Sequence, residues 1–66
     1  MTGKQLQDAR RYLNLTQSEL ARQLGIHKNT IARMERDELA IVRAIELAVK
    51  FLTSKKNKRG RTDGNK

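Results

Sequence analysis

Residues 17–36 read QSELARQLGIHKNTIARMER, and the spacing of apolar side chains in this stretch predicts two short helices joined by a tight turn. The first helix carries its apolar face on Leu20, Ala21 and Leu24. Gly25 then provides a backbone that enters the left-handed conformation at no steric cost. The second helix, over about residues 28–36, takes its apolar side from Ile26, Ile31 and Met34. Such a pair is typical of a helix-turn-helix.

Two more helices are predicted on either side of this pair, over about residues 3–13 and 40–52. Thr2 with Gln5, and Thr16 with Glu19, have the spacing of capping boxes, which predicts where the first two helices begin. Asn14 is expected to end the first helix, because asparagine tolerates the left-handed conformation. The chain has no proline and no strand-like alternation, so we expect an all-α fold.

The composition changes at residue 53. The last segment, 53–66, reads TSKKNKRGRTDGNK and has no large apolar side chain, so we expect residues 1–52 to form one compact four-helix domain and residues 53–66 a disordered basic tail. The 66 residues carry 15 Lys and Arg against 7 Asp and Glu, a net charge of +8, which favours a polyanionic partner. No apolar run is long enough for a signal sequence or membrane span, and with no cysteine this suits a cytoplasmic protein.

The predicted helix over residues 28–36 has a polar face that could read DNA. At 100° per residue, Thr30, Ile31 and Met34 point one way, and the other face carries Lys28, Asn29, Ala32, Arg33 and Arg36. Lys28 and Arg33 can donate to guanine O6 and N7, and Asn29 can pair with adenine N6 and N7. The plainer interpretation is a basic, solvated helix face; the adjoining turn glycine and packing pattern favour base contacts.

Other polar residues are expected near the DNA backbone or in the packing between helices. Gln17 opens a helix whose free amides could bind a phosphate, or it is simply exposed. Histidine is a poor N-cap, so we expect His27 to reach a phosphate or to pack against the preceding helix. The remaining candidates for backbone contacts are Lys4, Arg11, Arg36 and Arg43. Arg10 and Glu35 both fall at the borders of packed faces, which predicts a partly buried ion pair between them.

The predicted fourth helix has more apolar surface than one small domain needs. Apolar residues cover over half of its circumference, and only Arg43, Glu46 and Lys50 form a polar stripe. We therefore expect a homodimer through this helix, with an interface of Val42, Leu47, Val49 and Phe51. The alternative is a helix buried on several sides within one chain.

The sequence resembles the Cro and lambda-repressor-like helix-turn-helix family over about residues 6–52. The residues that carry the resemblance are Leu6, Arg10, Leu13, Leu15, the run TQSELARQLGI and the run TIARMER. The resemblance implies a compact all-helical domain that binds operator DNA as a symmetric dimer. It also implies DNA-contacting positions at Gln17, Lys28, Asn29 and Arg33, and it supports the Arg10–Glu35 pair. His27 stands where the family prefers Ser or Thr, Asp37 replaces the usual glycine, and no fifth helix follows residue 52.

These observations predict a sequence-specific regulator of transcription, most simply a repressor that binds a palindromic operator in double-stranded DNA as a homodimer. Its small size suits a phage or mobile element. The alternative is an antitoxin-like module that neutralises a partner protein and represses its own operon. We expect neither an enzyme nor a cofactor or metal, because the sequence has no nucleophile–base set, phosphate-cradling glycine loop or metal-ligand cluster.

Overall fold

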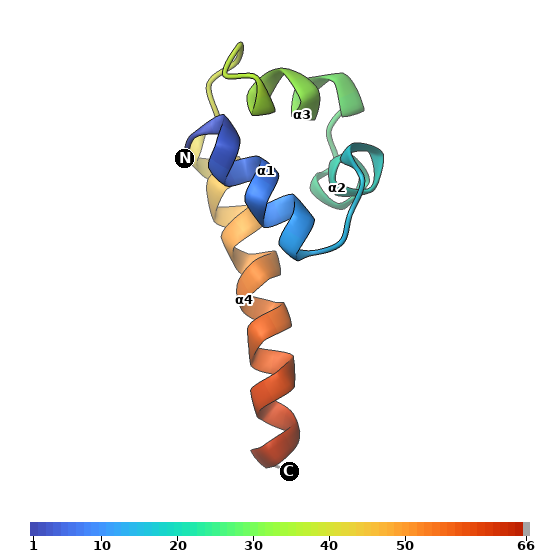
Figure 1. The fold of residues 1–66 in the computed structure, drawn as a ribbon, viewed down its shortest axis with the longest axis vertical. Helices are drawn as coiled ribbons and strands as arrows, with labels where there is room; N and C mark the ends of the chain where they lie inside the picture. The colour runs from blue at the N-terminus through green and yellow to red at the C-terminus, as the bar shows by residue number, and fades with distance from the viewer. Residues whose placement is uncertain (66) are drawn as a thin grey trace.

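The computed structural model describes the backbone of residues 1–65 and the side chains of residues 1–56. Four helices form this part of the chain (Figure 1): α1 (Gly3–Tyr12), α2 (Gln17–Leu24), α3 (Lys28–Glu35) and α4 (Arg43–Asn65). The described backbone contains no strand, so the predicted all-α fold is confirmed. In space, α3 packs against α2 and α1, and α1 packs against α4.

Capping boxes begin the first two helices, as the sequence predicts. The Thr2 hydroxyl accepts from the Gln5 main-chain N–H at 3.1 Å, and the Gln5 side chain accepts from the Thr2 N–H at 2.9 Å. Thr16 and Glu19 make the same two contacts at 3.1 and 2.8 Å. Each box satisfies two of the amide donors that a helix start leaves without a partner within the helix.

The first three helices end in the same way, through one residue with a left-handed backbone. These residues are Asn14 (φ 59°), Gly25 (φ 71°) and Asp37 (φ 60°). In each case the next residue donates to a carbonyl five positions earlier, so that the main chain closes the helix in a Schellman-type turn: Leu15 to Arg10, Ile26 to Ala21 and Glu38 to Arg33. The predictions for Asn14 and Gly25 are confirmed, and Asp37 makes the same kind of turn.

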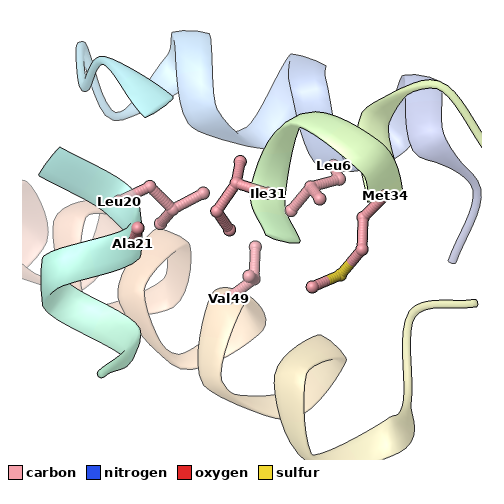
Figure 2. Close-up of a cluster of buried hydrophobic side chains, with 6 residues drawn as sticks. All are labelled: Leu6, Leu20, Ala21, Ile31, Met34 and Val49. Carbon is pink, nitrogen blue, oxygen red and sulfur yellow. The ribbon is translucent and has the colours of Figure 1, made fainter. Parts of the chain in front are cut away.

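Among the side chains of residues 1–56, six apolar ones are buried and form the core drawn in Figure 2. They come from all four helices: Leu6, Leu20, Ala21, Ile31, Met34 and Val49. Burying a side chain of leucine size contributes about 1.5–3 kcal/mol, so a core this small leaves the domain sensitive to every packing defect.

Gly3 brings the start of α1 against the end of α3. A Cβ atom at Gly3 would lie 2.5 Å from the Glu35 carbonyl oxygen and 2.6 Å from that of Met34, so no larger residue fits without backbone movement. The Gly3 main-chain N–H also donates to a side-chain oxygen of Asp37 at 2.8 Å. The end of α3 is therefore held both by shape and by a hydrogen bond.

The fourth helix differs from its predicted bounds at both ends. It begins at Arg43 rather than near residue 40, because the chain first leaves the Asp37 turn, and its helical backbone continues to Asn65 rather than ending near Leu52. Leu52 is where packing against the core ends, but a helix needs no buried face to continue, and no proline interrupts it.

The first residues of the predicted tail are helical and in contact with the domain. The Thr53 hydroxyl donates to the Lys50 carbonyl at 3.0 Å. The Lys56 ammonium group donates to the Tyr12 carbonyl and lies 4.5 Å from the centroid of the Tyr12 ring. The prediction of disorder is therefore wrong for residues 53–56. The rest of the predicted tail consists of residues 57–65, whose side chains lie outside the described part, and Lys66, which lies outside it entirely.

Candidate nucleic-acid interface

Helix α3 separates a packed face from a polar face. Ile31 and Met34 are buried against the other helices, whereas Lys28, Asn29 and Arg33 are exposed. This division follows from the helical period, because Ile31 and Met34 are three residues apart and share the packed face. Asn29 and Arg33 lie on the opposite side of the helix, and Lys28 lies at the border of the two faces. The exposed side chains offer an ammonium group, an amide and a guanidinium group, and these are the donors that recognise base edges and phosphates.

His27 is the N-cap of α3, contrary to our expectation that histidine would be a poor cap. Its Nδ1 atom accepts a hydrogen bond from the Asn29 main-chain N–H at 3.3 Å. Imidazole can replace the hydroxyl of Ser or Thr here because an unprotonated ring nitrogen is an acceptor. A ring that accepts at Nδ1 carries its proton on Nε2, so the exposed side chain retains one donor for the phosphate contact predicted at this position.

Arg10 and Glu35 form an ion pair between α1 and α3. The Arg10 Nε and Nη2 atoms donate to the two Glu35 carboxylate oxygens at 2.6 and 3.3 Å. The remaining Arg10 nitrogen, Nη1, donates to the Leu15 carbonyl at 3.0 Å. The Glu35 side chain is only 4% exposed, so its charge depends on these partners.

Gln17 belongs to the same network. Its side-chain Nε2 atom donates to a Glu35 oxygen at 3.1 Å, and this contact joins the start of α2 to the end of α3. One amide hydrogen of Gln17 is thus used within the protein, and the second is left for the predicted phosphate contact. Sequence reasoning missed this contact, because only the fold brings residues 17 and 35 together.

Arg33 and Arg36 share an acidic neighbour that sequence reasoning also missed. The Glu38 carboxylate accepts from Arg36 Nε at 2.8 Å and from Arg36 Nη2 at 3.1 Å, and one of its oxygens lies 4.0 Å from Arg33 Nε. The Arg36 hydrogen bonds hold the pKa of Glu38 below its ordinary value, and the same contact raises the pKa of Arg36. The only signal in the sequence was a glutamate two positions after Arg36.

Two further candidates for backbone contacts lie on other helices. Arg11 is in the last turn of α1, and Arg43 is the first residue of α4. Both side chains are exposed. Their contacts with DNA stay predictions, as do those of Gln17, His27 and Arg36.

Three of the four residues predicted for a dimer interface are exposed, two of them on α4 and the third, Val42, just before this helix begins. Leu47 is 51% exposed, Phe51 64% and Val42 59%. Val49, by contrast, is 1% exposed and lies in the core, so its assignment to an interface is wrong. The reason is helical geometry: Leu47 and Phe51 are four residues apart and share a face, whereas Val49 is two residues from each and points to the other side.

The described residues lack two other kinds of site. Across residues 1–56, the His, Asp and Glu side chains form no group of three that could hold a metal ion. Nor does any helix of the described chain combine the length and the apolar character that crossing a membrane requires.

Comparison with known families agrees with this geometry. A family model described as helix-turn-helix matches residues 6–50, which include most of α1, all of α2 and α3, and the first turns of α4. Since the match covers more than half of the chain, the protein belongs to the helix-turn-helix family of the Cro and lambda-repressor type. It is a DNA-binding helix-turn-helix regulator, and DNA is its partner. Comparison with curated proteins and with solved structures returned no match.

Proposed function

We propose that this protein is a sequence-specific regulator of transcription, most simply a repressor, that places α3 in the major groove of its operator. The observation that supports this proposal is the exposure of Lys28, Asn29 and Arg33 on one face of a helix whose opposite face is buried. An α-helix with its side chains is about 10–12 Å in diameter, which fits a major groove about 12 Å wide. Repression would follow from occlusion of the promoter, in the cytoplasm where the DNA lies.

In this proposal the residues divide into two groups. Lys28, Asn29 and Arg33 contact base edges and provide specificity. A second group contacts phosphates and provides affinity that decreases as the salt concentration rises. This group consists of Gln17, His27, Arg36, Arg11 and Arg43. The Arg10–Glu35 pair and its Gln17 contact serve both groups, because they hold α1, α2 and α3 in one relative orientation.

We further propose that two copies associate through α4 and bind a palindromic site. Leu47 and Phe51 present adjacent apolar surface on the face of α4 opposite the core, and Val42 is exposed just before the helix begins. Such surface supports a self-complementary interface. Two copies of α3 would then read half-sites about 34 Å apart, one turn of DNA. The same surface would serve a protein partner if the chain were antitoxin-like.

Selection of bound duplexes from a random pool tests the proposal directly. We expect a palindromic motif with half-sites one helical turn apart. Arg33→Ala should then lose about 1–3 kcal/mol of binding free energy at a single operator position and tolerate any base there. Arg22→Ala, which removes an exposed cation from α2, is the matched control and should leave the motif unchanged. Equal weakening on all duplexes by Arg33→Ala would contradict its role in base recognition.

A further inference from the structure

Glu38 holds the guanidinium group of Arg36 in a two-point contact at the end of α3. The two bonds, 2.8 and 3.1 Å long, use the Nε and Nη2 atoms along one edge of the guanidinium. The carboxylate also lies 4.0 Å from Arg33 Nε. One acidic group therefore faces two of the cations that the proposed function brings to DNA.

The ion pair between Arg36 and Glu38 contributes little to the stability of the folded state. The side chains of Arg36 and Glu38 are 59% and 50% exposed, and ion pairs in such exposed positions contribute little to folding. The pair also joins residues only two positions apart, so it ties no distant parts of the chain together. The larger effect of the pair is on ligand binding, because Glu38 occupies donors of the Arg36 guanidinium that another anion could use.

A DNA phosphate would use the same donors as Glu38. Guanidinium groups bind carboxylate and phosphate through the same two-point geometry. While Glu38 is in place, only the edge of Arg36 that contains Nη1 stays open, and a phosphate there would lie beside a carboxylate of like charge. A phosphate must therefore either displace Glu38 or approach against its repulsion.

We infer that Glu38 is an intramolecular competitor of the DNA backbone for Arg36. This inference rests on the proposed function, because it requires α3 to face DNA. Glu38 neutralises a phosphate-binding cation in the free protein and so lowers affinity for all duplexes alike. The base contacts of Lys28 and Asn29 are untouched, and the protein depends on them more heavily for tight binding. Glu38 thus weakens binding to operator and to non-operator DNA by the same factor.

The test is Glu38→Gln, which removes the charge and keeps the size of the side chain. We expect operator and random duplexes to bind about three- to tenfold more tightly, by the same factor, with a salt dependence steeper by about one released ion. Thermal unfolding should change little. Glu46→Gln, which removes an acid paired with Lys50 and the N-terminus rather than with a proposed DNA contact, is the matched charge control and should give a smaller gain. The double variant Arg36→Gln, Glu38→Gln should not show the gain.

The outcomes separate this inference from the proposed function. If the wild-type protein selects a duplex but Glu38→Gln binds it equally or less tightly, Glu38 does not compete and the inference is overturned alone. The same holds if the double variant Arg36→Gln, Glu38→Gln keeps the full gain, or if Glu46→Gln reproduces it. A wild-type protein that prefers no duplex sequence would overturn the proposed function and this inference with it.

Discussion

Asp37 accepts a hydrogen bond from the main-chain N–H of Gly3 at 2.8 Å, which joins the turn after α3 to the first residue of α1. This contact accounts for an acidic residue at a left-handed position, φ 60°. Glycine would adopt the backbone conformation at lower cost, but it has no side chain to accept from the free amide of the helix start. The carboxylate also places negative charge at the N-terminus of α1.

Substitutions at Asp37 should separate these two effects. Asp37→Ala loses both the acceptor and the tolerance of the left-handed backbone, so we expect the free energy of unfolding to fall by about 2 kcal/mol. Asp37→Asn keeps both properties and should cost about 0.5 kcal/mol or less, with Asp37→Gly in between. Urea unfolding measures all three. An alanine variant as stable as the asparagine variant would show that the Gly3 contact stabilises nothing.

Removing Arg10 should expose the cost of the buried Glu35 charge. Arg10→Met leaves Glu35 with only the Gln17 amide, and we expect a loss of about 3 kcal/mol or more in the free energy of unfolding. Adding Glu35→Gln removes the uncompensated charge and should restore much of this loss. Arg22→Met, which replaces an exposed arginine of α2, is the control. Unchanged thermal stability in Arg10→Met would mean that the pair is unimportant for folding.

Gly3→Ala should destabilise the protein even though alanine favours helices by about 1 kcal/mol over glycine. The added Cβ would meet the Glu35 and Met34 carbonyl oxygens at 2.5 and 2.6 Å, and both are main-chain atoms that cannot move independently. We expect a net loss of about 1–3 kcal/mol by urea unfolding. Lys4→Ala, at the exposed neighbouring position, should stay within about 0.5 kcal/mol of wild type. A stabilised Gly3→Ala variant would contradict the close approach of α1 to α3.

A charge on the exposed face of α4 should abolish the proposed dimer. Phe51→Glu places a carboxylate at the centre of that face, and Leu47 lies one turn away. We expect sedimentation equilibrium at micromolar concentration to show a dimer for wild type and a monomer for Phe51→Glu. Gln23→Glu adds the same charge at an exposed position of α2, and this variant should remain dimeric. A wild-type monomer that binds a palindromic site tightly would argue against this interface.

Stability should fall in acid in part through Glu38 and Glu46. The pKa of each lies below its ordinary value of 4.5, chiefly because Arg36 donates to Glu38 and Lys50 to Glu46. A carboxyl group with a lowered pKa in the folded state stabilises that state above its unfolded pKa, and the contribution disappears as pH falls through the folded value. Thermal unfolding from pH 7 to pH 3 should therefore show a loss that begins near pH 4.5. The double variant Glu38→Gln, Glu46→Gln should lose less thermal stability between pH 7 and pH 3 than the wild type. An equal loss in the two proteins would mean that other groups cause the acid sensitivity.

The features that follow from neighbours along the chain could be predicted. The capping boxes at Thr2 and Thr16, and the left-handed residues Asn14 and Gly25, depend on contacts within a few residues, so the sequence contains their whole cause. The two faces of α3 follow from the helical period. The expected partners Arg10 and Glu35 do meet, because the packed faces on which they lie are themselves periodic.

Predictions failed where local pattern leaves several outcomes open. Helix α4 is apolar on most of its circumference, so its pattern could not show that Val49 packs inward while Leu47 and Phe51 remain exposed. The predicted end of that helix was wrong because loss of apolar residues ends burial and not helix formation, and Lys56 then contacts Tyr12. His27 was dismissed as a cap on propensity alone, although its ring nitrogen provides the acceptor.

The amino-acid sequence by itself determined that this protein is a small, basic, all-helical DNA-binding domain, and which residues its third helix presents on its polar side, because caps, turns and helical periodicity are short-range. Only the tertiary structure decided which face of α4 enters the core, why Gly3 and Asp37 stand where they do, and how Gln17 and Arg10 converge on Glu35. These relationships join residues up to 34 positions apart, and they depend on the angles at which helices pack rather than on any local preference of the chain.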